Sequence, residues 1–256
     1  MADVVVSRCA LPPGTNQYDA LCQWVDELVT ARTRLLDIGA GDGDDDYAGR
    51  LKELVGRYVG VDPDPATAHN AVLDDWYEGT IEAYAAEVGE PFDVALAIYV
   101  VEHVADPVAF LTAARRCLEP GGSLFVLTPN LWHYFAPLSW LTARLHIDGQ
   151  VLRWLRAARP ETHDAAHFPT SYRMNSVTAF TKHARRAGFV QVDVRHLDDP
   201  GIFEAYFPGR LVTLPRGYSR LVRRLALAGT YGTLLCRLVA NGDSLSASPS
   251  SSARPS

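Results

Sequence analysis

Three glycines at alternate positions, followed directly by three aspartates, are the first residues whose spacing points to chemistry. The stretch "LLDIGAGDGDDDYAG" holds Gly39, Gly41 and Gly43, and then Asp44 to Asp46. Glycines spaced this way bring the backbone close to a nucleotide. A dinucleotide fingerprint needs its third glycine where Asp44 stands, and its pyrophosphate would lie at the start of the next helix. Because the aspartates would repel a pyrophosphate, the sequence favours S-adenosylmethionine, which has adenine, ribose and a cationic sulfonium but no phosphate.

A second acidic position supports a nucleotide site. Asp62 follows Gly41 by 21 residues and ends a short apolar run. A carboxylate at the end of the second strand can accept hydrogen bonds from both ribose hydroxyls. Proteins that bind NAD use the same device, and an aspartate before Pro63 can also be a simple turn residue. A nicotinamide oxidoreductase therefore stays open as an alternative, although the aspartate run opposes it.

Four histidines are candidates for a general base. They are His103, His133, His163 and His167. A sulfonium methyl group is already activated, so the protein mainly supplies alignment and excludes water. A hydroxyl acceptor also benefits from a base, whereas a carboxylate acceptor does not. We rank His103 and His167 as the catalytic candidates, and a hydrogen-bonded or surface histidine is the alternative for each. We expect Glu102 to fix its loop.

The elements that must position these residues alternate between strands and helices. Apolar runs predict strands over 34–39, 57–62, 92–98, 123–128 and 189–194, and helical spacing predicts helices over 18–28, 47–55, 105–118 and 175–188. Asp106 is the expected N-cap of the third helix, and Gly121 with Gly122 is expected to stop it. We expect 232–240 to form a final edge strand. This alternation predicts a mostly parallel sheet with helices on both faces.

The alternation fails between residues 131 and 174. This stretch is rich in aromatic residues and follows a strand at the ligand edge of the sheet, so we expect a substrate lid. Trp132, His133 and Tyr172 are the substrate contacts that we expect in it. The aromatic side chains that could build an apolar pocket, or equally a satellite core of the insertion, are Trp132, Tyr134, Phe135, Trp140, Trp154, Phe168 and Tyr172.

Composition limits the class of protein. The chain has 256 residues, 48% of them hydrophobic, and a formal net charge of -6, which argues against a nucleic-acid partner. Its four cysteines are far apart, so neither a metal site nor a disulfide framework is expected. Without a leader pattern or a long apolar run, the sequence predicts a cytoplasmic protein. We expect one domain over 1–243 and a disordered tail over 244–256.

One segment is strongly basic. Residues 205–242 contain six arginines and no acidic residue, among many leucines and valines. One interpretation is a solvated helix face that docks an apolar stripe on the sheet. The other is a surface for anionic lipid or for a phosphorylated substrate.

Four motifs carry a resemblance to a known family. "LLDIGAGDG", "YVGVDPD", "FDVALAIYVVEHVADP" and "CLEPGGSLFVLTPN", in this order, resemble class I S-adenosylmethionine-dependent methyltransferases of the small-molecule and quinone-type group. The resemblance covers about residues 30–195. It implies an α/β, Rossmann-like fold with an insertion after the fifth strand that forms a lid.

The resemblance also implies roles for individual residues. Asp37, Gly39 and Gly41 would line the methionine part, and Asp62 would take the ribose. The remaining residues that we assign to the cofactor are Ala40, Pro63, Thr80, Ile81 and Glu82 on the adenine side, and Tyr99, Val100 and Val101 below the site. The segment beside the adenine is longer than the family usually has.

The function that the resemblance implies is methylation of a small molecule. Oxygen is the favoured acceptor, in a secondary-metabolite or lipid-quinone pathway, and S-adenosylhomocysteine would be the product. Methylation at nitrogen or carbon remains open, and so does a non-catalytic regulatory module that only binds the cofactor.

Overall fold

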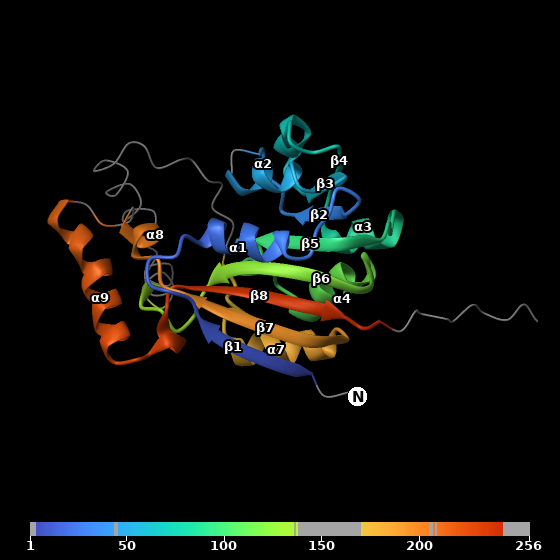
Figure 1. The fold of residues 1–256 in the computed structure, drawn as a ribbon. Coiled ribbons are helices and arrows are strands. Elements are labelled where there is room, and N and C mark those ends of the chain that lie inside the picture. Colours follow the sequence, from blue (N-terminus) through green and yellow to red (C-terminus); the bar gives the residue numbers. More distant parts are fainter. Residues whose placement is uncertain are drawn as a thin grey trace, which may run out of the picture.

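A computed structural model describes residues 4–43, 46–135, 137, 170–204, 207 and 209–242. Eight strands form one sheet in the order β1-β7-β8-β6-β5-β2-β3-β4 (Figure 1). The strands are β1 Val5–Ala10, β2 Arg34–Ile38, β3 Arg57–Asp62, β4 Asp75–Glu78, β5 Phe92–Ile98, β6 Leu118–Pro129, β7 Phe189–Leu197 and β8 Thr233–Ala240. All neighbouring pairs are parallel except those made by β8, which runs antiparallel to both β6 and β7.

Helices cover both faces of the sheet (Figure 1). They are α1 Gln17–Asp26, α2 Asp46–Lys52, α3 Ile81–Glu87, α4 Pro107–Arg116, α7 Val177–Arg186, α8 Pro200–Glu204 and α9 Thr213–Arg224, with short 3-10 turns η1 Pro65–His69, η2 Gly209–Val212 and η3 Ala228–Thr230. The helices α3, α4 and α7 pack on one core, which includes Phe92 and Phe180. On the other face α1 and α2 enclose a second core, where Trp24 meets Phe125 edge to face. Burial of these apolar side chains is the main stabilising contribution.

The predicted fold class is confirmed, and several elements match closely. The strands β3 and β5 have the predicted bounds. Asp106 caps α4 by accepting from the backbone N–H groups of Val108 and Ala109. Ser176 caps α7 in the same way through Ala179. These ends agree with the sequence because capping depends on residues only two or three positions apart.

Three predicted details are wrong. The strand over 232–240 is not at the edge, because β8 lies between β6 and β7. Gly121 and Gly122 do not stop the helix, because α4 already ends at Arg116 and both glycines lie inside β6. The first helix ends at Asp26, so Leu28 falls outside it and is exposed.

Two strands were not predicted. β1 extends the sheet beside β7, and all six of its residues are exposed, so it lacks the buried alternation that identifies a strand. β4 is only four residues long and mostly exposed. Both lie at sheet edges, where one face of a strand need not be apolar.

Some predictions fall outside the described residues. These are the positions Asp44, Asp45, Trp140, Trp154, His163, His167 and Phe168, most of the expected lid, and the tail over 244–256. Among the residues that the structure describes, no helix combines the length and apolarity needed to cross a membrane.

Candidate functional site

The glycine turn after β2 has backbone conformations that favour glycine. Gly39, Gly41 and Gly43 have φ of 79°, 53° and 88°, a region that other L-residues seldom adopt. A Cβ on Gly39 would lie 2.3 Å from Cγ2 of Val100, so this glycine lets the turn pack against the segment after β5. A Cβ on Gly41 would meet nothing within 4 Å. Gly41 therefore leaves a backbone surface open on the side where a ligand can approach.

Asn70 fixes this turn from the segment after η1. Its side-chain amide donates to the carbonyl oxygens of Ala40 and Gly41, at 3.1 and 3.3 Å. The same side chain fills the space beside Gly43, where a Cβ would come within 2.4 Å of its Oδ1. Sequence reasoning missed Asn70, because a buried asparagine in a loop has no periodic signal.

Asp62 joins the glycine turn to the end of β3. One carboxylate oxygen accepts from the backbone N–H of Gly41 at 3.0 Å, and the other accepts from the backbone N–H of Asp64 at 2.8 Å. Each carboxylate oxygen has a second lone pair, so the group can still accept from hydroxyls. The structure thus brings Asp62 and Gly41 together, as the sequence predicted, while Pro63 beside them is exposed.

Asp37 lies beneath the turn, at the end of β2. Its Oδ2 accepts from the hydroxyl of Tyr58 at 2.7 Å and from that of Tyr47 at 3.3 Å. Burial, and then the charge of Asp37, raise the pKa of Tyr58 well above its usual value, so this phenol stays protonated and keeps donating. The carboxylate is thereby held in one orientation next to the open backbone of the turn.

The residues expected around adenine lie at the start of α3, directly after β4. β3 and β4 pair Asp62 with Glu78, and the N–H of Gly79 donates to the carbonyl of Asp62 at 2.9 Å. Thr80 is the N-cap of α3 and accepts from Ala83. Ile81 is buried in the core below, and Glu82 is half-buried. The sheet register thus brings this segment next to Asp62.

The segment after β5 packs against the glycine turn. Tyr99 has φ of 57°, and its hydroxyl donates to Oε1 of Gln17, the buried first residue of α1. Burial raises the pKa of Tyr99 well above its usual value. Val100 packs against Gly39, and Val101 is fully buried. Gln17 was not predicted to take part, because its contact joins residues 82 positions apart.

A buried polar network surrounds Glu102, the residue that follows Val101. The Thr128 hydroxyl donates to Oε2 of Glu102 at 3.0 Å, and the Asn175 amide donates to the Thr128 oxygen at 2.6 Å. The carbonyl of Glu102 accepts from the N–H groups of Ser171 and Tyr172. Burial raises the pKa of Glu102 to about 7. The expected role of Glu102 in fixing its loop agrees with these bonds, which also place Tyr172 beside this loop.

The two described histidine candidates have different surroundings. His103 is half-buried in the turn after β5, where its backbone N–H donates to the carbonyl of Val100. His133 is buried, and this burial lowers its pKa to about 4, although the charge of Asp198 opposes the shift. Its ring contacts those of Tyr134 and Phe203, each with centroids 4.2 Å away. His133 is therefore a neutral member of an aromatic cluster at pH 7.

That aromatic cluster bears on the expected substrate wall. It joins the start of the insertion to α8 and α9, and its rings belong to His133, Tyr134, Phe135, Phe203, Phe207 and Tyr218. Trp132, next to it, has 67% of its surface exposed. For the described part of the insertion, the satellite-core interpretation thus describes Tyr134 and Phe135, whereas the exposed ring of Trp132 can contact another molecule.

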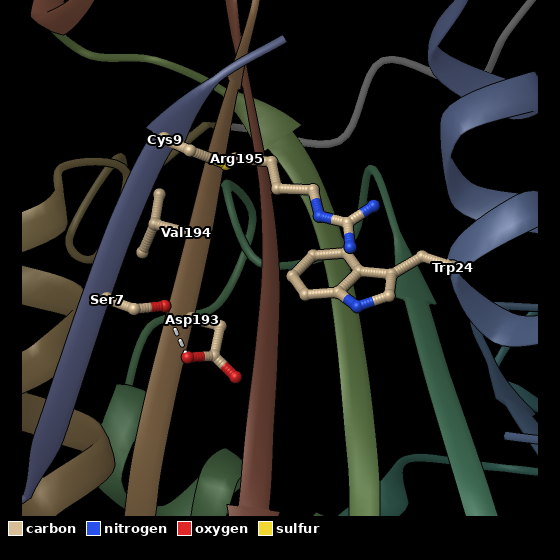
Figure 2. Close-up of a pocket in the computed structure, with 6 residues that line it drawn as sticks. All are labelled: Ser7, Cys9, Trp24, Asp193, Val194 and Arg195. Atoms are coloured by element: carbon tan, nitrogen blue, oxygen red, sulfur yellow. Dashed lines mark hydrogen bonds between the residues drawn. The ribbon is translucent and has the colours of Figure 1, made fainter. Parts of the chain in front are cut away.

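A separate hollow lies over the other half of the sheet (Figure 2). It has about 240 Å³ and is lined by Ser7, Cys9, Trp24, Asp193, Val194 and Arg195. The guanidinium of Arg195 lies over the Trp24 ring, 3.7 Å from its centroid, and Ser7 donates to Asp193. It is smaller than usual ligand pockets. None of its lining residues belongs to the glycine turn, so this hollow is separate from the candidate cofactor site.

The residues present fit S-adenosylmethionine. Gly41 offers open backbone, the Asp62 carboxylate has spare acceptor capacity, and Asp37 is held in place by two phenols. All three lie at the carboxyl ends of neighbouring parallel strands, which is where ligands of such sheets bind. The buried carboxylates of Asp37 and Asp62 suit a cationic cofactor.

Comparisons with known proteins agree with this geometry. Residues 15–194 match a family model described as "Methyltransferase domain". A "Ubiquinone biosynthesis O-methyltransferase" of Cereibacter sphaeroides (strain ATCC 17029 / ATH 2.4.9) is 37% identical over 168 residues, which are 62% of this chain and 61% of that relative. The chain thus spans about three fifths of the length of the curated relatives that it matches first.

Solved structures show the same fold. Phosphoethanolamine N-methyltransferase 2 of Haemonchus contortus, in complex with phosphomonomethylethanolamine and S-adenosylhomocysteine, gives a TM-score of 0.54 at 17% identity, over 89% of this chain and 53% of that chain. A SAM-dependent methyltransferase from Archaeoglobus fulgidus gives 0.50 at 13% identity, over 88% and 96%. Together with the family match, the glycine turn and Asp62, these likenesses lead to one conclusion: the chain belongs to the class I S-adenosylmethionine-dependent methyltransferases.

Proposed function

We propose that this protein transfers the methyl group of S-adenosylmethionine to an oxygen atom of a small molecule, in a secondary-metabolite or lipid-quinone pathway. The observation that carries the proposal is the open backbone at Gly41 beside the anchored carboxylate of Asp62. The names of the curated relatives support oxygen as the acceptor and a quinone-type substrate.

The cofactor contacts that we propose follow the geometry of the turn. The Asp62 carboxylate accepts from the ribose hydroxyls, and the turn from Gly39 to Gly41, with Asp37 below it, holds the methionine part. Thr80 to Glu82 flank the adenine, and Tyr99 to Val101 close the site from below. When bound, the cofactor supplies an activated methyl group on a sulfonium.

For the transfer we propose His103 as the base among the described residues. The acceptor oxygen attacks the methyl carbon, the carbon–sulfur bond breaks with its electron pair going to sulfur, and the hydroxyl proton goes to the imidazole. His103 follows β5 at the carboxyl edge of the sheet, as such a base should. His167, our other candidate, lies outside the described residues.

We propose that Trp132 and Tyr172 contact the substrate and that residues 131–174 select it. Trp132 is exposed beside the aromatic cluster, and Tyr172 is hydrogen-bonded next to Glu102. His133, which we also expected to contact substrate, has its ring packed among Tyr134, Phe203 and Tyr218, and a supporting role fits it better. A contact of residues 205–242 with lipid or with a phosphorylated substrate is a further proposal, because this segment is rich in arginine and has no acidic residue.

Calorimetry and product analysis test this function. Titration with S-adenosylmethionine, S-adenosylhomocysteine and NAD should show binding of the first two only. Incubation with S-adenosylmethionine and a catechol that carries a short prenyl chain should give a product heavier by one methylene group. His103→Gln should lower the rate about 10²- to 10⁴-fold, whereas His69→Gln, an exposed histidine of η1, should not. Binding of NAD in place of the methyl donor would refute the proposal, and binding without any methylated product would favour the regulatory module.

A further inference from the structure

The helix α9 and its flanking turns expose leucines that the core does not use. Each of these leucines keeps 46% to 56% of its surface exposed, and they are Leu211, Leu214, Leu221, Leu225 and Leu227. The arginines exposed in the same segment are Arg210, Arg216, Arg220 and Arg224. We call these nine residues the Leu/Arg face. Singly exposed leucines are ordinary, but five in 17 consecutive residues form a patch that points to a partner.

The opposite side of α9 packs against the rest of the protein. Pro215, Ser219 and Val222 are buried, and the Ser219 hydroxyl donates to the carboxylate of Asp198. Arg223 forms an ion pair with the same carboxylate. These contacts fix the rotation of the helix, so the leucines face outward as a consequence of packing. The first interpretation of this segment, a face that docks on the sheet, therefore describes only its inner side.

Apolar and cationic side chains are sorted on the outer side. Leu214, Leu221 and Leu225 are separated by seven and four residues, which places them on one stripe. Arg216, Arg220 and Arg224 follow at intervals of four and form the neighbouring stripe. A helix with a leucine stripe beside an arginine stripe suits a lipid surface, because leucines enter the acyl boundary while arginine stems reach up to the headgroups.

The charge of the Leu/Arg face indicates which kind of surface it can bind. No acidic residue occurs between 205 and 242. Arg216 donates through Nε and Nη2 to the two carboxylate oxygens of Glu204, at 2.6 and 2.9 Å. Within the described ranges, no ion pair joins Arg210, Arg220 or Arg224 to a carboxylate. The charge of this face is thus complementary to anionic headgroups, and it stands out on a chain whose formal net charge is -6.

The position of α9 is a further argument. It projects from the end of the sheet where the parallel strands finish and where β8 begins (Figure 1). Asn130 ties the start of the insertion to this end by donating to the carbonyls of Gly229 and Tyr231, each at 2.8 Å. Two residues further on stands the exposed Trp132, whose amphipathic ring suits a membrane interface.

From these observations we infer that the Leu/Arg face docks on an anionic lipid bilayer. The contact is peripheral: α9 lies in the plane of the headgroups, with its leucine stripe toward the acyl chains. The glycine turn is at the same end of the sheet, so docking holds the substrate side of the protein close to the lipid. This inference stands apart from methyl transfer, because a protein that binds no lipid could still methylate a soluble acceptor.

Sedimentation of the full chain with vesicles tests the inference. Binding is expected with phosphatidylcholine vesicles that contain phosphatidylglycerol and not with phosphatidylcholine alone, and it should weaken as salt is added. Arg220→Glu with Arg224→Glu should lower the partition coefficient at least about tenfold. Leu221→Gln with Leu225→Gln should lower it with the charge unchanged.

A matched control uses two arginines at the other end of the sheet. Arg185 and Arg186 are exposed in the last turn of α7, so Arg185→Glu with Arg186→Glu makes the same change of net charge away from α9. This control should keep most of the binding, and circular dichroism should show that all variants fold.

Three results would overturn the inference. In the first, the α9 variants bind vesicles as well as the parent does. In the second, inorganic phosphate displaces the protein more strongly than chloride of equal ionic strength, which would assign the arginines to a free phosphorylated ligand. In the third, vesicle binding is absent and sedimentation velocity shows a dimer that the leucine variant dissociates, which would assign the face to a second copy.

Discussion

At the scale of single residues, Asp62 has two structural partners before any ligand arrives. Its carboxylate holds the N–H groups of Gly41 and Asp64. Asp62→Ala should therefore weaken S-adenosylmethionine binding at least about tenfold, since charge-assisted bonds to ribose are worth about 1.5 to 3 kcal/mol each and the turn also loosens. Calorimetry measures this. The control is Asp75→Ala on the neighbouring β4, whose exposed carboxylate pairs with Arg57. Equal affinity in a folded Asp62 variant would make Asp62 a turn residue only.

Glu102 and His133 predict opposite dependences of stability on pH. The pKa of Glu102 is raised from 4.5 to about 7, so the folded state binds the extra proton and Glu102 reduces stability as the pH rises through that interval. The pKa of His133 is lowered from 6.5 to about 4, so its contribution to stability is lost as the pH falls through that interval. Each shift corresponds to about 3 kcal/mol, and the two contributions largely offset each other in the parent.

Single variants separate these contributions. Relative to the parent, Glu102→Gln should gain about 3 kcal/mol of unfolding free energy between pH 4 and 7.5. Relative to the parent, His133→Phe should gain a similar free energy of unfolding as the pH falls from 7.5 to 4. Phenylalanine is the chosen replacement because it fits the aromatic cluster. Urea unfolding across this range is the measurement. Curves parallel to that of the parent would show that neither group titrates differently on folding.

At the scale of elements, two glycines of the turn after β2 should affect stability and cofactor binding differently when each is replaced by alanine. Gly39→Ala places a Cβ 2.3 Å from Val100 and should cost about 1 to 3 kcal/mol of stability through overpacking, in addition to roughly 1 to 2 kcal/mol from its positive φ. In Gly41→Ala the new Cβ meets no atom within 4 Å. The variant should therefore lose only the roughly 1 to 2 kcal/mol of stability that a positive φ costs a residue other than glycine. Because its Cβ occupies the open side of the turn, Gly41→Ala should nevertheless lose more affinity for the cofactor.

Thermal unfolding and calorimetry together check this contrast. Adding Val100→Ala to Gly39→Ala should restore part of the stability, since it removes the clashing methyl group, and it should not help Gly41→Ala. If both glycine variants lost affinity in proportion to stability, the open side of Gly41 would not face the cofactor.

At the scale of the whole molecule, β1 is an addition to the edge of the methyltransferase sheet. In the sheet it pairs with β7 alone, and four strands separate it from β2, which leads into the glycine turn. It also precedes the residues that match the family model. A chain lacking residues 1–10 should unfold at lower temperature yet bind S-adenosylmethionine with nearly unchanged affinity. A chain ending at Leu197 should not fold, because it loses β8, which bonds to both β6 and β7. Loss of cofactor binding in the first truncation would show that the edge strand supports the site at long range.

Several features of this protein were determined by the sequence alone, because they depend on neighbours along the chain. β3 and β5 are short apolar runs that are buried in the sheet. Asp106 caps its helix through the amides of Val108 and Ala109, which are only two and three residues away. The glycine turn is local in the same sense, since the φ values of Gly39 and Gly41 belong to the turn itself. The cofactor class followed from these local features.

Only the tertiary structure decided what depends on residues distant in the chain. The sequence of β8 does not specify its neighbours, and its place between β6 and β7 results from pairing with strands that begin over 40 and over 100 residues earlier. Asn70 acts on the glycine turn from 30 residues away. His133 is neutral because Phe203 and Tyr218 bury it. Burial and long-range pairing arise when the whole chain packs, and no local pattern of residue types encodes them.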